Sequence, residues 1–271
     1  MKVFEVRDFC DTDAFLQVYL REKTYEFVVH DKRPLMLICP GGGYTWTADR
    51  EAEPVALAMI RAGFQACVLR YSVRKTKEDP GLGDRPLHEA ASAIAYARAH
   101  AEEWGIDPQK ITVCGFSAGG HLAGSIATLW NKPERTGVPA EEARPNAAVL
   151  CYGVLTAFGP THAESIKNLT GVEGPSEMDS LYSPDSNVSA DTVPVFIWHT
   201  AEDDCVPVES ALKMACAMRK AGRPFALHIY THGWHGLSLV TEEVGGGPAE
   251  AKSWFSVMLD WLESMNVGTG Y

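Results

Sequence analysis

A serine flanked by glycines stands directly after an apolar run. The segment Gly115-Phe116-Ser117-Ala118-Gly119 follows the run Lys110–Cys114 and opens a stretch with helical periodicity. A serine hydroxyl is a weak nucleophile, and a sharp turn from strand to helix presents its oxygen to a base. Glycines leave room where a Cβ would clash with the neighbouring strand and helix. The pattern predicts that Ser117 is a nucleophile, against the alternative of a glycine-rich turn without chemistry.

Acidic and histidine residues follow the serine, each group in a loop just past an apolar run. The run Val193–Trp198 leads to the acids of Glu202–Asp204, and the run Phe225–Tyr230 leads to His232 and His235. The order serine, acid, histidine along the chain is one of the orders in which serine hydrolases carry their catalytic triad. A metal site built from the histidines is disfavoured, because His228 lies mid-strand and no carboxylate pattern accompanies them.

A glycine trio follows an earlier apolar run, in the segment Pro40-Gly41-Gly42-Gly43. Backbone N–H groups of glycines can approach a developing oxyanion with no side chain in the way. A flexible turn or a phosphate-binding loop is the alternative. Neither Gly-Lys-Ser/Thr nor Gly-x-Gly-x-x-Gly is present, so nucleotide binding is disfavoured.

The elements that must position these loops alternate between strands and helices. Continuous apolar strands separated by helices indicate an α/β fold with a mostly parallel central sheet covered on both faces, whose ligands bind at the carboxyl ends of the strands. The stretch Thr156–Thr192 is too long for an ordinary loop and suggests a small cap, with a helix near His162–Leu169. The expected strands are an opening hairpin of Ala14–Leu20 and Tyr25–Val29, then Leu35–Cys39, Phe64–Tyr71, Ile111–Cys114, Ala147–Tyr152, Val195–His199 and Ala226–Tyr230. The expected helices are Glu51–Ala62, Pro86–Ala101, Ala118–Leu129, Val208–Ala221 and Ala249–Glu263.

The motifs together resemble the α/β-hydrolase superfamily, most closely the small esterases that include acetyl esterases, acetylxylan esterases and lipase-like proteins. The resemblance runs from about Pro34 to the C-terminal helix. It implies a single α/β-hydrolase domain over residues 1–271 that hydrolyses carboxylic esters without a metal or organic cofactor. The motifs that carry it are Pro40-Gly41-Gly42-Gly43-Tyr44, Gly-Phe-Ser-Ala-Gly-Gly-His-Leu, His-x-x-x-Asp-x-x-Val-Pro and Gly-Trp-His-Gly.

The resemblance also chooses among the candidate triad residues. The family's Gly-x-His-Gly pattern fits His235 rather than His232, and His-x-x-x-Asp-x-x-Val-Pro selects Asp203, with Asp204 next. The implied triad is therefore Ser117, Asp203 and His235, in which serine attacks the ester carbonyl and histidine moves the proton.

Other site residues follow from the same resemblance. The expected oxyanion donors are the N–H groups of Gly42, Gly43 and Ala118, and Pro40 stands where many relatives carry histidine. His121 is expected to pack and hydrogen-bond beneath the site. Three aromatic residues are placed to line an acyl or sugar pocket, although core packing alone would also explain them: Tyr44, Trp46 and Trp234.

Composition and net charge limit the binding partners and the compartment that we expect. The formal charge of −11 argues against nucleic acid and anionic membrane surfaces, and the small-molecule ester is the expected partner, with a homo-oligomer left open. Seven scattered cysteines without a Cys-x-x-Cys pair suit a reducing compartment, and an N-terminus without an apolar signal region favours the cytoplasm.

The leading expectation for the substrate is a short acyl ester of a sugar, in particular acetylated xylose or xylo-oligosaccharides. Enzyme alternatives are a feruloyl or short-chain lipid esterase and an arylformamidase-like amidase. The non-enzyme alternative is an inactive hydrolase fold used as a binding module, which an intact triad and glycine loop disfavour.

Overall fold

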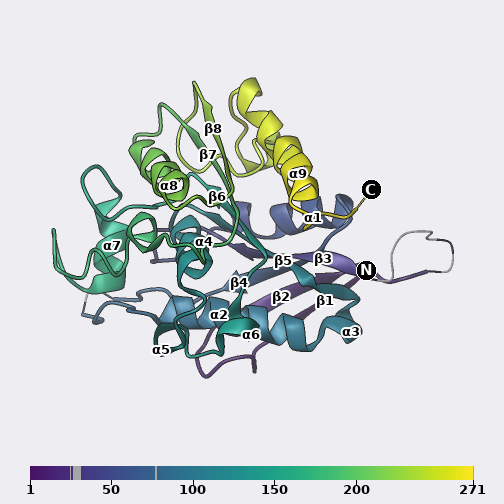
Figure 1. Cartoon of the computed structure of the whole chain (residues 1–271). Coiled ribbons are helices and arrows are strands. Elements are labelled where there is room, and N and C mark those ends of the chain that lie inside the picture. Colours follow the sequence, from purple (N-terminus) through teal and green to yellow (C-terminus); the bar gives the residue numbers. More distant parts are fainter. Residues whose placement is uncertain (25, 27–31, 77, 271) are drawn as a thin grey trace.

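One eight-stranded sheet forms the centre of the protein. The structure, a computed structural model, describes residues 1–24, 26, 32–76 and 78–270 (Figure 1). The strand order is β1-β2-β4-β3-β5-β6-β7-β8, antiparallel from β1 to β4 and parallel from there on, which confirms the predicted mostly parallel sheet. The strands are β1 (Lys2–Val6), β2 (Phe15–Leu20), β3 (Arg33–Cys39), β4 (Gln65–Arg70), β5 (Ile106–Phe116), β6 (Ala147–Cys151), β7 (Val195–Thr200) and β8 (Phe225–Tyr230).

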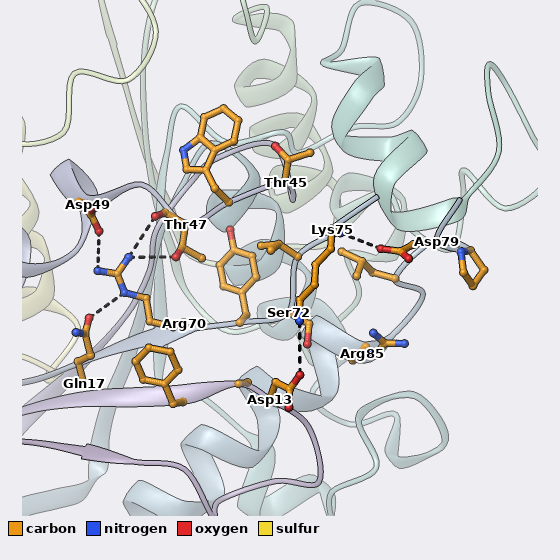
Figure 2. A pocket seen from close by; sticks show the side chains of 17 residues that line it. Asp13, Gln17, Thr45, Thr47, Asp49, Arg70, Ser72, Lys75, Asp79 and Arg85 are labelled. Carbon is orange, nitrogen blue, oxygen red and sulfur yellow. Dashed lines mark hydrogen bonds and ion pairs between the residues drawn. The ribbon is translucent and has the colours of Figure 1, made fainter. Parts of the chain in front are cut away.

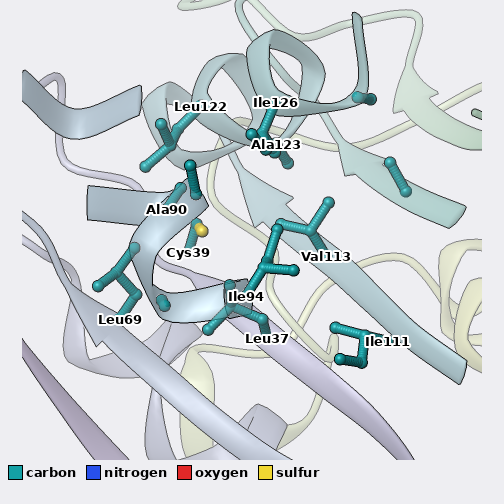
Figure 3. Close-up of a cluster of buried hydrophobic side chains, with 14 of the residues drawn as sticks. Leu37, Cys39, Leu69, Ala90, Ile94, Ile111, Val113, Leu122, Ala123 and Ile126 are labelled. Atoms are coloured by element: carbon teal, nitrogen blue, oxygen red, sulfur yellow. The ribbon is translucent and has the colours of Figure 1, made fainter. Parts of the chain in front are cut away.

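Helices cover both faces of this sheet, and alternate residues of β3 show how. Leu35, Leu37 and Cys39 join a cluster beneath α2 and α4, whereas Met36 and Ile38 join a second cluster with α1 and α9. Figure 3 shows the first cluster, where Ile94 and Ile126 are drawn beside the sheet residues. The helices are α1 (Glu53–Arg61), α2 (Arg85–Ala99), α3 (Ala101–Trp104), α4 (Ala118–Leu129), α5 (Pro133–Thr136), α6 (Ala140–Ala143), α7 (Ala163–Thr170), α8 (Glu209–Lys220) and α9 (Trp254–Ser264).

The opening hairpin differs from the prediction. β2 falls within the expected strand 14–20, but it pairs with β1, from Lys2 opposite Leu20 to Val6 opposite Leu16. The expected second half, residues 25–29, lies outside the described residues except for residue 26. β1 is an edge strand with mostly exposed side chains, so its sequence lacks the apolar run by which the buried strands were found.

The segment 156–192 is tied to the loops beside it. It contains α7 near the predicted helix and a short 3₁₀ turn, Pro184–Asn187. The side-chain amide of Asn168 donates to the carbonyl of Gly43 at 2.8 Å, and the Asn168 carbonyl accepts from the N–H of Leu82 at 3.0 Å. α7 is therefore held against the glycine loop. No helix in the described part of the chain is long and apolar enough to cross a membrane.

Candidate active site

Ser117 occupies a strained turn between β5 and α4. Its φ of 54° lies in the left-handed region, which non-glycine residues rarely adopt and which costs roughly 1–3 kcal/mol. A Cβ at Gly115 would lie 2.0 Å from the carbonyl oxygen of Gly119, and one at Gly119 would lie 2.0 Å from that of Cys39. Both positions therefore require glycine, so that the strand end and the helix start can pack closely around the serine.

The side chains of Ser117, His235 and Asp203 form a continuous hydrogen-bonded chain. The Ser117 Oγ lies 2.7 Å from the His235 Nε2, and the His235 Nδ1 lies 2.7 Å from the Asp203 Oδ2. Because a carboxylate only accepts, Nδ1–H donates to Asp203 and leaves Nε2 free to accept the serine proton. This is the geometry in which an imidazole can act as general base toward a hydroxyl.

Asp203 is a buried carboxylate with several donors around it. Its Oδ1 accepts from the N–H groups of Cys205 at 3.0 Å and Val206 at 2.9 Å. The His199 Nε2 lies 3.3 Å from its Oδ2 and also donates to the Val206 carbonyl at 2.8 Å. Burial alone would raise the pKa of Asp203, but these donors and His235 together lower it below its ordinary value. The acid is thus held ionised beside the imidazole.

The rival residues lie apart from the serine. His232 is exposed, and its Nδ1 pairs with the Glu202 Oε1 at 2.9 Å, a contact that raises the pKa of His232. Asp204 is also exposed. His228 stacks on Phe196, with ring centroids 5.0 Å apart. Among the described residues, no group of three or more His, Cys, Asp or Glu side chains could hold a metal ion.

The glycine loop packs directly against the serine. A Cβ at Gly41 would lie 2.9 Å from the Cβ of Ser117, and one at Gly42 would lie 2.2 Å from the carbonyl oxygen of Trp46. Gly42 and Gly43 have φ of 125° and 62°. Ala118 is the first residue of α4, where the helix supplies no acceptor for the N–H group. The role of the Gly42, Gly43 and Ala118 N–H groups as oxyanion donors stays a prediction.

A cavity of about 350 Å³ opens in front of these groups, and we call it the inner cavity. Trp46, which is 60% exposed, belongs to its lining, whereas Trp234, which is 56% exposed, lines a separate hollow with Glu202 and His232. The inner cavity is lined by Gly42, Gly43, Thr45, Trp46, Ala48, Arg50, Glu51, Ser117, His162, Glu164, Cys205 and His235.

Tyr44 does not line this cavity. Its ring is fully buried, edge-on to Tyr71 with centroids 5.6 Å apart. The His121 Nε2 donates to the Tyr182 carbonyl at 2.7 Å, so His121 Nδ1 accepts from the Tyr44 hydroxyl at 2.8 Å. The expectation that His121 packs and hydrogen-bonds beneath the site is confirmed. The pocket role expected for Tyr44 is replaced by core packing, since its ring has no exposed surface and its hydroxyl is bonded to His121.

Sequence reasoning missed Glu51, a buried carboxylate in the wall of the inner cavity. Its Oε2 accepts from the Gly41 N–H at 2.7 Å, and its Oε1 accepts from the Tyr152 hydroxyl at 2.8 Å. The Tyr152 oxygen in turn accepts from the Ser238 N–H at 2.8 Å, three residues after His235. Burial raises the pKa of Glu51, and the hydrogen bonds from Tyr152 and Gly41 oppose that rise. One side chain thereby joins the glycine loop to the loop that carries His235.

The sheet and its covering helices are those of the α/β-hydrolase fold. The family model described as BD-FAE matches residues 16–218, and the chain belongs to the BD-FAE family. The chain is similar to an acetyl ester-xyloside bifunctional hydrolase from Caldicellulosiruptor lactoaceticus, with 35% identity and a TM-score of 0.81 over 96% of this chain and 90% of that one.

Two curated relatives are also similar. Endo-1,4-beta-xylanase B of Butyrivibrio fibrisolvens is 36% identical over 221 residues, which cover 80% of this chain and 34% of the relative. An acetylxylan esterase of Xylanibacter ruminicola is 30% identical over 210 residues, which cover 74% of this chain and 40% of the relative. The chain thus spans about a third to two fifths of the length of these two proteins.

Proposed function

We propose that the protein is a serine carboxylic ester hydrolase that removes acetyl groups from xylose and xylo-oligosaccharides. The observation that carries the activity is the chain of two 2.7 Å contacts from Ser117 through His235 to Asp203. The preference for acetylated sugars is supported by the similarity to the acetyl ester-xyloside hydrolase and to the acetylxylan esterase.

In the proposed reaction, His235 Nε2 takes the proton of Ser117 as its Oγ attacks the ester carbonyl. The new C–O bond gives a tetrahedral oxyanion, which the N–H groups of Gly42, Gly43 and Ala118 stabilise; each such donor is worth roughly 3–4 kcal/mol. His235 then returns the proton to the leaving alcohol, and the acyl-enzyme forms. Water, deprotonated by the same histidine, attacks the acyl-enzyme; the bond between the acyl carbon and Ser117 Oγ then breaks, His235 returns the proton to Oγ, and acetate leaves.

The ionised Asp203 supports this cycle by holding His235 in one tautomer and stabilising the imidazolium that forms when the proton is taken. Its low pKa keeps it charged throughout. All seven cysteines are free, which is consistent with work in a reducing compartment such as the cytoplasm.

A fluorophosphonate probe followed by mass spectrometry tests the nucleophile. We expect one adduct, on Ser117, and none in the variant Ser117→Ala. The substrate is tested by release of acetate from acetylated xylose and by a series of p-nitrophenyl esters. An unlabelled but folded protein would support an inactive binding module instead, and fast release of ferulate with no release of acetate would make the protein a feruloyl esterase.

A further inference from the structure

A larger cavity lies beside the inner cavity, on the other side of the segment that follows the oxyanion glycines. We call it the outer cavity; its volume is about 780 Å³, within the range of about 300–1,000 Å³ common for small-molecule sites. Thr45 and Trp46 line both cavities. After them, Thr47 and Asp49 face the outer cavity, whereas Ala48 belongs to the inner one. The two cavities therefore share one wall.

The lining of the outer cavity combines aromatic surface with balanced charge (Figure 2). Trp46 and Phe15 supply aromatic rings, and Trp46 is mostly exposed. The charged members are three carboxylates and three cationic side chains: Asp13, Asp49, Asp79, Arg70, Lys75 and Arg85. A lining without net formal charge favours neither an anion nor a cation, and so many polar groups do not suit a plain acyl chain.

Part of this polar lining is held rigidly. The Arg70 guanidinium donates to the Gln17 Oε1 at 2.8 Å, to the Thr47 Oγ1 at 3.1 Å and to the Asp49 Oδ1 at 2.9 Å. Figure 2 shows these hydrogen bonds from Arg70 along one side of the cavity. Lys75 reaches Asp13 at 3.7 Å through an exposed ion pair, which is weak and easily exchanged for contacts to a ligand. Fixed and exchangeable polar groups beside an aromatic face suit a neutral ligand that carries many hydroxyls.

We propose that the outer cavity binds unesterified sugar units of an acetylated xylo-oligosaccharide while one acetylated unit of the same chain reacts at Ser117. The inference rests on the proposed function. Trp46 stands at the shared wall, where it can stack on the apolar face of one sugar ring as the chain passes from one cavity to the other. Binding energy gained in the outer cavity would be available to the reaction in the inner one.

Binding is tested on the Ser117→Ala protein by calorimetry with unsubstituted xylotetraose, which has no ester to cleave. We expect saturable binding, weakened about tenfold by adding Trp46→Ala, which corresponds to about 1.4 kcal/mol. The matched control is Trp234→Ala, which removes an equally exposed tryptophan outside both cavities and should leave binding unchanged.

Steady-state kinetics of the active enzyme provide a second test, with the variant Lys75→Ala. Lys75 lines the outer cavity and not the inner one. We expect the ratio of kcat/KM for acetylated xylotetraose to kcat/KM for acetylated xylose to fall about threefold to tenfold, as the loss of one or two hydrogen bonds predicts. Activity on p-nitrophenyl acetate should not change, and Lys132→Ala, an exposed lysine elsewhere, should have no effect on the ratio.

The failures of the two proposals are distinguishable. Suppose that p-nitrophenyl acetate and acetylated xylose are hydrolysed, that xylotetraose does not bind, and that kcat/KM is no higher for acetylated xylotetraose than for acetylated xylose. The outer cavity is then not a sugar site, and the esterase assignment stands. If no ester is hydrolysed, the proposed function fails. A loss of feruloyl-ester hydrolysis alone in Trp46→Ala and Lys75→Ala would place an aromatic acyl group in the outer cavity and overturn the inference.

Discussion

Glu51 offers a sharp test of how the site is held together. Its two carboxylate oxygens accept one hydrogen bond each, from the Gly41 N–H and from the Tyr152 hydroxyl. Glu51→Gln keeps the shape but replaces one acceptor with an NH₂ donor. Whichever way the amide is turned, one of the two buried donors loses its partner. Such a loss costs roughly 1–3 kcal/mol, so we expect the free energy of unfolding to fall by that amount.

The effect on catalysis should go beyond this loss of stability. Gly41 directly precedes the expected oxyanion donors Gly42 and Gly43, and a shift of about 1 Å at a reacting group can cost on the order of 100-fold in rate. Complete loss of one donor costs roughly 10²- to 10³-fold in kcat. We therefore expect kcat of Glu51→Gln on p-nitrophenyl acetate to fall about 10- to 100-fold, with little change in KM.

The assay combines steady-state kinetics with urea unfolding at one temperature. Glu53→Gln, an exposed glutamate in the first turn of α1, is the matched control and should leave both quantities unchanged. Tyr152→Phe removes the contact to Glu51 and the acceptor of the Ser238 N–H, but it keeps the bond from the Gly41 N–H to Glu51, so its loss of kcat should be the smaller one. The reasoning is refuted if Glu51→Gln loses stability but keeps kcat within about twofold of the wild type, because Glu51 would then only support the fold.

Four further outcomes are expected. Ser117→Ala should abolish ester hydrolysis in a folded protein; His235→Ala should be nearly as damaging, and His232→Ala should have a mild effect. The measurement is kcat/KM on p-nitrophenyl acetate, and activity retained by Ser117→Ala would mean that another residue is the nucleophile. Asp203→Asn should cost more activity than Asp204→Asn. The pKa of Asp203 is lower in the folded than in the unfolded protein, so its ionised form stabilises the fold above about pH 4, and this stabilisation is lost as the pH falls below that value. Urea unfolding at a series of pH values should show this loss in the wild type and not in Asp203→Asn. The value of kcat/KM should fall as the pH is lowered, because the histidine base must be neutral to accept the serine proton; a profile that stays flat down to the pH at which the protein unfolds would contradict a histidine base. Acetyl or propionyl p-nitrophenyl esters should be the best substrates, since the inner cavity holds only about 350 Å³ and has an indole in its wall, whereas a preference for octanoyl would require the cavity to open.

Short-range patterns were enough to predict the parallel sheet and the loops that carry the candidate triad. Each of the three residues stands just past a strand of apolar sequence, and parallel strands bring their carboxyl ends to one edge of the sheet. The structure brings Ser117, Asp203 and His235 together there, and their catalytic roles stay a prediction.

The features that the sequence did not predict depend on distant contacts or on backbone direction. Glu51 looked like the first residue of a helix, because nothing nearby reveals a partner, Tyr152, 101 residues away. Tyr44 was expected in the pocket because it follows the glycines, yet its ring packs in the core against Tyr71 and its hydroxyl bonds to His121. The edge strand β1 has too few buried side chains to be read from hydrophobicity.

The position of Cys205 has a practical consequence for inhibitor studies. Cys205 is an exposed residue in the lining of the inner cavity, two residues after the buried acid. Partial burial of its thiol, together with the carboxylates of Asp203 and Asp204, raises the pKa of the thiol. Its reaction with thiol reagents should therefore be slow at neutral pH. Once attached, however, a bulky adduct would obstruct the cavity mouth. Loss of activity after alkylation would then report blocked access, and it would not indicate a cysteine nucleophile in this protein.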